Sequence, residues 1–245
     1  MTSRRDCLRL AAAAAAWPLA ARAQTATPPV RGVVELFTSQ GCSACPPADA
    51  LLGEWARSDD VVALGYHVDY WDYLGWKDTF ASPQNTQRQR DYAARLDGSV
   101  YTPQAVVNGG VHLVGSHREA IEARLAAEAP LPVPVVVRET GPTIVIETGA
   151  ADGHAAHVVL AYFKPRAAVD VARGENRGRR LTYWNVVTDL HTVGMWHGRA
   201  QRYELPASEL ARKGASGCAV LLQTADAAGR PGRVLGAAAT GGAGR

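Results

Sequence analysis

The sequence predicts an α/β protein in two parts. Strands and helices alternate in the first part, and the second part is almost wholly strands with a sandwich-like pattern. Three observations predict this class. A Cys-x-x-Cys pair, Cys42 and Cys45, lies between a short apolar strand and a helix. A second strand follows that helix, as in a βαβ unit. From Pro134 onward, short apolar runs alternate with turns, which is typical of a β-sandwich.

Size and composition agree with this class. The chain has 245 residues, of which 47% are hydrophobic and 20% charged, as in globular proteins with room for two domains. We expect the first domain over residues 31–130 and the second over residues 131–245. The arginines of residues 1–23 account for the formal net charge of +3, so the rest of the chain is neutral. A neutral body gives no reason to expect a nucleic-acid partner.

Residues 1–23 have the pattern of an export signal. Arg4 and Arg5 precede a short apolar run, and small residues precede an expected cleavage site before Gln24. Paired arginines favour the twin-arginine route, and an ordinary secretory signal is the alternative. Either route gives a periplasmic or secreted protein. The apolar run is too short to span a bilayer, so no stable membrane insertion is expected. Residues 24–30 are expected to be a flexible start.

The elements of the first domain follow from apolar patterning and turn residues. Residues 33–38 form an apolar run rich in β-branched and aromatic side chains, which predicts a buried strand. The remaining predicted elements are a helix from the cysteine pair to residue 56, a strand over 61–68, a helix over 83–96, a strand over 104–107, a turn at Asn108-Gly109, a strand over 111–114, and a helix capped by Ser116 that ends near 128.

The second domain reads as a series of short strands. They are predicted over residues 135–138, 143–147, 158–162, 169–171, 181–190, 201–204 and 218–223, with one short helix around 206–212. Cys218 opens an apolar stretch and is expected to be an inert buried thiol. The histidines of this half show no metal spacing and no catalytic arrangement. We therefore expect the second domain to support the first or to present it to a partner.

The order of elements in the first domain is that of thioredoxin. Thr102-Pro103 stands just before the third strand, where thioredoxin-like folds place a cis-proline beside the Cys-x-x-Cys pair. A proline offers no N–H and a fixed φ, which suits a place where a substrate chain approaches the backbone. The sequence therefore predicts a thioredoxin-like first domain with Thr102 and Pro103 at a substrate-binding edge.

Redox chemistry explains the spacing of the two cysteines. Cys42, near a helix N-terminus, is stabilised as a thiolate and attacks a disulfide. Cys45, one turn further, resolves the mixed disulfide. The expected partners are protein or small-molecule disulfides and dithiols, and no cofactor is needed.

Two other interpretations of the pair remain open. The cysteines could bind copper or zinc with help from His67, His112 or His117. They could also form a purely structural disulfide in a non-catalytic binding module.

A long aromatic segment follows the second strand. Trp71 and Trp76, together with His67 at the end of that strand, are predicted to line a substrate-binding rim, because the segment leaves the strand at the edge that also carries Cys42. The alternative is that the aromatic side chains pack the loop onto the core.

A basic run covers residues 173–180. Its glycines and its single glutamate favour a solvated turn. Binding of an anion or a partner is the alternative interpretation.

Several motifs together resemble one known family. Residues 35–47, ELFTSQGCSACPP, resemble the signature of a family of secreted, thioredoxin-like bacterial proteins catalogued mainly as a domain of unknown function. Residues 67–72, 75–76, 101–104 and 174–178 are similar to its further motifs. The resemblance covers nearly the whole mature chain. It implies the fold, and it brings no established catalytic role.

Overall fold

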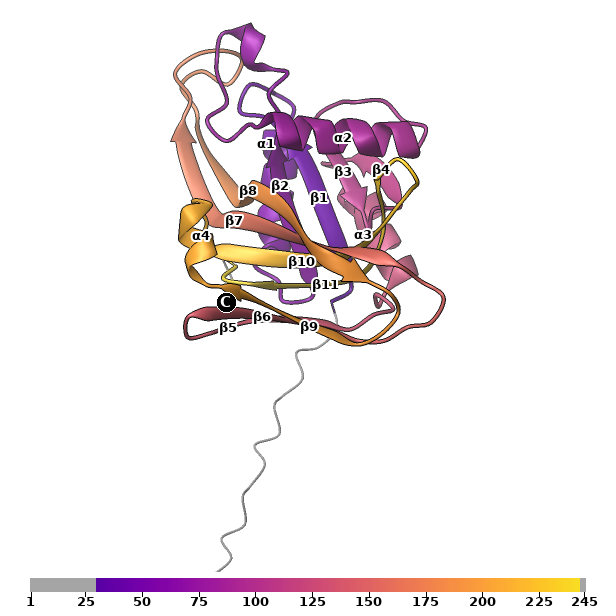
Figure 1. Ribbon diagram of the computed structural model, residues 1–245. Coiled ribbons are helices and arrows are strands. Elements are labelled where there is room, and N and C mark those ends of the chain that lie inside the picture. The colour runs from indigo at the N-terminus through magenta and orange to yellow at the C-terminus, as the bar shows by residue number, and fades with distance from the viewer. Residues whose placement is uncertain (1–29, 243–245) are drawn as a thin grey trace, which may run out of the picture.

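The computed structural model describes residues 30–242 and is a mixed α/β structure with two sheets (Figure 1). One sheet has eight strands in the order β11-β10-β7-β8-β2-β1-β3-β4, and the other has three in the order β5-β6-β9. The expected export signal and nearly all of the expected flexible start lie outside the described residues. Within residues 30–242, no helix combines the length and the apolar character needed to cross a membrane.

The first half of the chain supplies one end of the large sheet. β1 (Gly32–Thr38) pairs in parallel with β2 (Val61–His67) and antiparallel with β3 (Gln104–Val107). β3 continues into β4 (Val111–Val114) through the expected turn. Asn108 and Gly109 in that turn have φ values of 48° and 62°, as the two central residues of a type I′ turn require, and the N–H of Gly110 donates to the carbonyl of Val107.

Helices cover both faces of these strands. α1 (Pro46–Trp55) and α3 (Arg118–Glu128) bury their apolar side chains against one face of β1, β2 and β3. α2 (Pro83–Arg95) contributes Tyr92 to a core on the opposite face. Every residue of β1 and β2 is buried, as expected for strands covered on both sides.

The second half of the chain extends the same sheet. β7 (Ala156–Asp170) and β8 (Arg180–Trp196) form a long antiparallel hairpin, and β10 (Gly217–Ala225) joins β7 to β11 (Pro231–Thr240). β8 meets β2 at one paired position, Gly65 with Val186. The expected boundary near residue 130 therefore falls between two parts of a single sheet (Figure 1).

The small sheet packs against the large one. It contains β5 (Val135–Thr140), β6 (Thr143–Thr148) and β9 (Gln201–Pro206). Apolar residues of β5 and β6 meet those of β7, β10 and β11 in one core, which includes the buried thiol of Cys218. The expectation of a buried Cys218 is thus confirmed. Two short helices, η1 (Asp72–Leu74) and α4 (Ser208–Arg212), lie outside the sheets.

The structure differs from the expected elements in three places. The strands predicted over 158–162 and 169–171 are one strand, β7, because Pro165 lies within a long hairpin and does not end it. β11 was not predicted, since its sequence is rich in alanine and glycine, which have low β-propensity. The Ser116 cap was wrong, because His117 is the N-cap residue of α3 and no side chain caps it.

Candidate functional site

Cys42 and Cys45 are joined by a disulfide bond, and their Cα atoms are 5.4 Å apart. Cys45 is the N-cap residue of α1 and already has helical dihedral angles, whereas Cys42 lies in the turn before it. Both residues are buried, with 1% of Cys42 and none of Cys45 exposed. A partner can therefore reach the sulfur of Cys42 only if the parts of the chain around it move.

The N-terminus of α1 has fewer free donors than a typical helix. Pro46 and Pro47 carry no N–H groups, and the N–H groups of Ala48 and Asp49 donate to the carbonyl of Cys45. The expected support of a Cys42 thiolate by this terminus therefore rests on the helix dipole more than on backbone donors.

Thr102-Pro103 is a cis peptide and lies beside the first turn of α1. A Cβ atom on Gly115 would lie 3.2 Å from both Pro103 and Ala48, which shows that the proline and the helix approach the same point. Trp71 donates from its indole nitrogen to the Thr102 hydroxyl at 2.8 Å. Trp71 also lies against Gly41, so it connects the proline side of the site to the residue before Cys42.

Gln40 organises the turn before Cys42. Its backbone N–H donates to a carboxylate oxygen of Asp78 at 2.7 Å. Its side-chain oxygen accepts from the indole of Trp76 at 2.9 Å, and its side-chain amide donates to Thr79 at 3.0 Å. The aromatic loop that follows β2, residues 69–82, is thus fixed to the turn that carries the disulfide.

The loop between β7 and β8, residues 171–179, covers the same turn from the other side. Asn176 is completely buried, and its side-chain amide donates to the carbonyls of Gln40 and Cys42, both at 2.9 Å. Glu175 accepts from the backbone N–H of Ser43 at 3.2 Å, and hydrogen bonds from Ser43 lower the pKa of this glutamate. The expectation of a solvated turn was therefore wrong for Asn176, although the flanking arginines are exposed.

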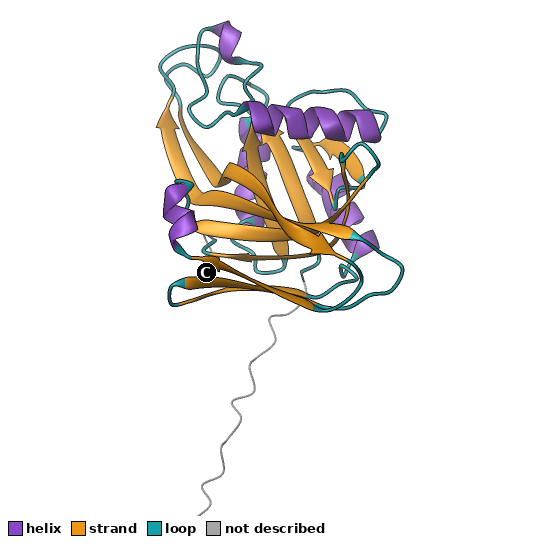
Figure 2. Cartoon of the chain, in the orientation of Figure 1, coloured by secondary structure: helices purple, strands orange, loops and turns teal. Residues whose placement is uncertain are grey.

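These two segments, residues 69–82 and residues 171–179, are called the covering loops below. They meet where Trp76 lies against Gly174. Figure 2 shows the loops gathered at the end of the sheet where β1 and β2 finish. The disulfide is thus enclosed by two segments that are far apart in sequence.

His67 ends β2 and points into the interior. Its side chain is fully buried, and its Nδ1 atom lies 2.7 Å from a carboxylate oxygen of Asp78. The rings of Phe80 and Tyr183 stand edge-on to the imidazole. Burial opposes ionisation of Asp78, but the charge and the hydrogen bond of His67 lower the pKa of Asp78 below its ordinary value. His67 therefore lies buried behind the disulfide turn, and its side chain is not exposed to a partner.

Asp49 is the second buried carboxyl group near the disulfide. It lies one helical turn after Cys45, and residues four apart in a helix share a face. Only 5% of Asp49 is exposed, and its Oδ2 atom has no hydrogen-bond partner among the described residues. Burial raises the pKa of Asp49 to about 7, although nearby His67 acts to lower it.

The structure brings the predicted site residues together in part. Trp71, Thr102 and Pro103 lie around the disulfide turn, Trp76 ties one covering loop to that turn, and His67 lies buried behind it. Sequence reasoning missed four residues whose contacts define the site, Gln40, Asp49, Asp78 and Asn176. Gln40 and Asp49 flank the cysteine motif, Asn176 lies in residues 174–178, and Asp78 follows the aromatic segment, but residue type alone did not show which side chains turn inward.

Two of the three histidines considered for a metal site have other contacts. His67 pairs with Asp78, and the Nδ1 atom of His112 lies 3.1 Å from the Tyr101 hydroxyl. His117 is exposed at the start of α3. Within residues 30–242, no group of three or more His, Cys, Asp or Glu side chains is arranged to hold a metal ion.

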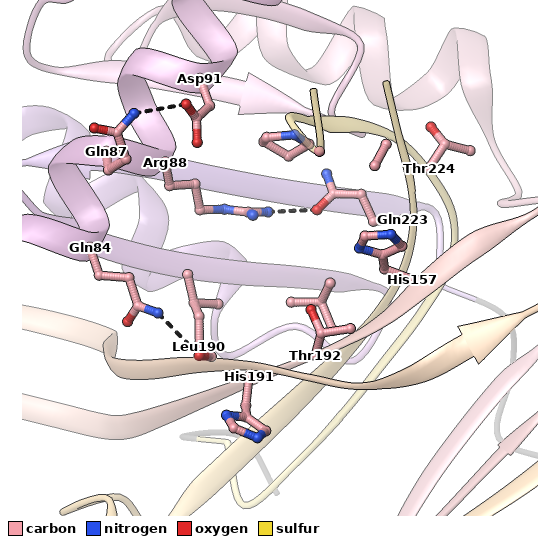
Figure 3. Close-up of a pocket in the computed structure, with 14 residues that line it drawn as sticks. Gln84, Gln87, Arg88, Asp91, His157, Leu190, His191, Thr192, Gln223 and Thr224 are labelled. Carbon is pink, nitrogen blue, oxygen red and sulfur yellow. Dashed lines mark hydrogen bonds between the residues drawn. The ribbon is translucent and has the colours of Figure 1, made fainter. Parts of the chain in front are cut away.

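A polar hollow of about 240 Å³ lies elsewhere, between α2 and the strands of the second half (Figure 3). Arg88 reaches from α2 to Gln223 on β10 at 2.9 Å and pairs with buried Glu35 on β1 at 2.6 Å. Gln84 donates to the carbonyl of Leu190 on β8 at 3.1 Å. None of the predicted site residues lines this hollow, and its buried contacts join the two halves of the chain.

Fold and site together define a mixed α/β protein whose Cys-x-x-Cys disulfide is enclosed beside a cis-proline. The chain belongs to the family described as a protein of unknown function, DUF1223, whose model matches residues 33–223. This confirms the resemblance, noted from the sequence, to a family catalogued as a domain of unknown function. No curated protein matches the chain.

Two solved structures are similar to this one. Protein AGR_C_4864 from Agrobacterium tumefaciens is 47% identical, with a TM-score of 0.79, and the match covers 86% of this chain and 94% of that one. HBP35 of Porphyromonas gingivalis is 12% identical, with a TM-score of 0.61, over 87% of this chain and 76% of that one. At such low identity, the second match shows a shared fold alone.

Proposed function

We propose that this protein is an exported thiol–disulfide oxidoreductase, with its Cys42–Cys45 disulfide on a thioredoxin-like half of the chain. The observation that carries the proposal is the disulfide at the N-terminus of α1, with cis-Pro103 against the first turn of that helix. The export pattern of residues 1–23 supports an oxidising compartment, where such a disulfide persists. The partners in this proposal are polypeptides or small molecules that carry a pair of thiols.

The oxidised form acts as the oxidant in this scheme. A thiolate of the partner attacks the Cys42 sulfur, so that a partner–Cys42 bond forms while the Cys42–Cys45 bond breaks. The electron pair of the broken bond leaves on the Cys45 sulfur. The partner's second thiolate then attacks its own sulfur in the mixed disulfide and releases Cys42 as a thiolate. The partner leaves with a disulfide, and the protein keeps two electrons.

Asp49 supplies a proton in the first step. A thiolate at Cys45 would be completely buried, and burying an unpaired charge is costly. Asp49 shares a helix face with Cys45, and a carboxyl group with a pKa of about 7 still holds a proton near neutral pH. Transfer of this proton leaves a neutral Cys45 thiol and an Asp49 carboxylate, which His67 then faces.

A second candidate function follows from the burial of the pair. Because Cys42 is 1% exposed and Asn176 binds its carbonyl, the disulfide could serve only to hold the covering loops of a binding module. The two candidates predict different reduction potentials. Active oxidoreductases lie between about −270 and −120 mV, whereas structural disulfides usually lie below about −300 mV.

The test is the reduction potential of Cys42–Cys45 in the purified protein, equilibrated with glutathione or dithiothreitol buffers. We expect a value in the range of active oxidoreductases, and oxidation of a dithiol peptide by the oxidised protein. Cys42→Ser should abolish that oxidation, while Cys218→Ser, which removes the buried thiol, should leave it unchanged. A potential below about −300 mV, or activity that survives Cys42→Ser, rejects the redox function.

A further inference from the structure

A groove of about 470 Å³ runs along the helix that carries the disulfide. One wall is α1, from Pro46, the residue after Cys45, to Arg57 just beyond the end of the helix. The other wall is formed by Arg166 on β7 and by the start of β8. The groove therefore begins beside the disulfide and leads away from it.

Trp184 forms the floor of the groove between two arginines. The Arg57 guanidinium lies 4.6 Å from the centre of the indole ring, and that of Arg166 lies 5.5 Å from it. A Cβ atom on Gly53 would lie 2.4 Å from the indole nitrogen, so the ring packs directly on α1. Such cation–π stacking holds the guanidinium groups in place while leaving their N–H donors available.

The charges of the groove are unbalanced. Within residues 30–242, neither Arg57 nor Arg166 forms an ion pair, and Arg180 adds a third guanidinium, which pairs with Asp170 at an exposed position. The acidic side chain Glu54 on the α1 wall is already paired with Arg118 at 2.7 Å. The groove thus presents a net positive surface to a ligand.

Asp49 also lines this groove, close to its disulfide end. The side chain is buried, and its Oδ2 atom lacks a partner among the described residues. Because burial raises its pKa to about 7, Asp49 is mostly uncharged in mildly acidic solution and does not repel an anion there. A groove that contains both an unpartnered buried carboxyl group and two arginines without ion pairs indicates a place where a polar ligand completes the contacts.

We propose that the groove binds an extended, acidic segment of the polypeptide whose thiols the disulfide oxidises. The proposal rests on the proposed function, and it adds the substrate class and its position. α1 has ten residues and is about 15 Å long, a length that about four or five residues of extended chain cover. Carboxylates about four residues from the reacting cysteine therefore reach Arg57 and Arg166, where planar guanidinium groups can bind them with two hydrogen bonds.

The binding test uses fluorescein-labelled peptides of about ten residues in which serine replaces the reacting cysteine, so that no redox step is involved. One peptide carries glutamates on the N-terminal side of the serine and another on the C-terminal side, and matched peptides carry glutamine instead. We expect one glutamate peptide to bind by fluorescence anisotropy at low salt, and its binding to weaken as sodium chloride rises from about 50 to about 500 mM. Equal binding of the glutamine peptides would overturn the proposal.

Paired variants locate the contact. The double variant Arg57→Gln/Arg166→Gln should weaken binding by about tenfold, which is the loss of affinity expected when two exposed ion pairs are removed together. Arg199→Gln removes an exposed arginine from the turn between β8 and β9 and should leave binding unchanged. If the double variant binds as tightly as the wild type, the groove is not the site.

The two proposals can fail separately. Reduction of the double variant by dithiothreitol, an uncharged dithiol, should proceed at the wild-type rate, because dithiothreitol carries no carboxylate for Arg57 and Arg166 to bind and neither arginine takes part in the redox step. If the disulfide has the potential of a structural bond but the glutamate peptide binds and depends on the two arginines, the groove stands and only the redox function falls. If the disulfide is redox-active but the glutamate and glutamine peptides bind equally well, only the proposal for the groove is rejected.

Discussion

Asn176 fixes the backbone on both sides of Gly41 with one side-chain amide. Its two hydrogen bonds reach the carbonyls of Gln40 and Cys42, and the residue is completely buried. The amide satisfies acceptors that would otherwise lie unpaired in the interior. A single side chain from the β7–β8 loop thereby limits how far the disulfide turn can move.

Asn176→Ala removes both bonds and leaves two carbonyls without this donor. We expect the free energy of unfolding to fall by about 2 kcal/mol or more in urea denaturation, because unpaired buried acceptors are costly. Reduction of the disulfide by dithiothreitol should also become faster, since the covering loop is released. Arg177→Ala, an exposed neighbour in the same loop, is the control and should change neither quantity. Unchanged reduction in the Asn176 variant would show that this residue does not limit access.

Asp49 makes stability depend on pH in a direction that can be worked out. Its ordinary pKa is 3.8 and its pKa in the folded protein is about 7, so between these values the folded state holds a proton that the unfolded state has lost. Stability therefore falls as pH rises through this window. Asp49→Asn removes the effect, and we expect it to stabilise the protein by about 2–4 kcal/mol at pH 8, with a smaller gain toward pH 4.

Urea denaturation of Asp49→Asn at several pH values checks this expectation. Asp152→Asn changes an exposed aspartate and is the matched control. Parallel pH profiles for the wild type and the Asp49 variant would contradict the assigned pKa. The same variant should slow reduction of the disulfide near neutral pH, because Cys45 then lacks its proton donor.

α2 connects the two halves of the chain through a buried ion pair. Arg88 on α2 binds Glu35 on β1 and Gln223 on β10, and Tyr92, also on α2, donates to the same glutamate at 2.5 Å. Water cannot replace these partners of Glu35, since no part of the Glu35 side chain is exposed.

Arg88→Met leaves Glu35 buried without its cation. We expect a loss of about 3–5 kcal/mol in unfolding free energy, the usual cost of removing one partner from a buried pair. Adding Glu35→Gln should recover part of the loss, because the uncompensated charge is gone. Arg90→Met changes an exposed arginine of the same helix and should have little effect. A double variant as unstable as Arg88→Met alone would argue that lost packing, and not charge, is responsible.

At the level of elements, the sequence predicted most of the first half. β1, β2, β3 and α2 lie within one or two residues of the ranges expected, because apolar runs and Gly or Pro boundaries identify such elements well. The misses have physical causes. β11 is built of small residues since its neighbours come close, and a Cβ atom on Gly236 would lie 2.2 Å from the carbonyl oxygen of Val133. Such a strand has no apolar pattern to read.

The candidate site was predicted in part for a similar reason. The cysteines, Thr102 and Pro103 form local motifs, and local motifs can be read from one sequence. The contact of Asn176 with Cys42 spans more than a hundred positions and depends on how the β7–β8 hairpin is placed. No local pattern encodes that placement, so the loop looked like a solvated turn.

The fold of the whole molecule depends on one large sheet whose strands come from both halves of the chain. β2 would be an edge strand without β8, although all its residues are buried in the structure. The core that contains Phe37 and Tyr66 also contains Phe163, Val187 and Leu221 from the second half. The two halves therefore complete each other's core.

A fragment of residues 30–130 should consequently fail to fold as an independent unit. We expect it to lack a cooperative unfolding transition by circular dichroism and to aggregate through the exposed edge of β2. Residues 30–242 under the same conditions are the control and should unfold cooperatively. A sharp, reversible transition in the short fragment would show that the first half is an autonomous domain.

The pairing of Gly65 with Val186 has a consequence for the order of events during synthesis. The ribosome releases β2 long before β8, so one side of β2 has no partner until most of the chain has emerged. Pairings between distant segments form slowly, because the loop that separates them must first be closed. We therefore expect the β7–β8 hairpin to join β2 late, and the same step brings Asn176 to Cys42. Enclosure of the disulfide then requires that the chain has been made at least as far as β8.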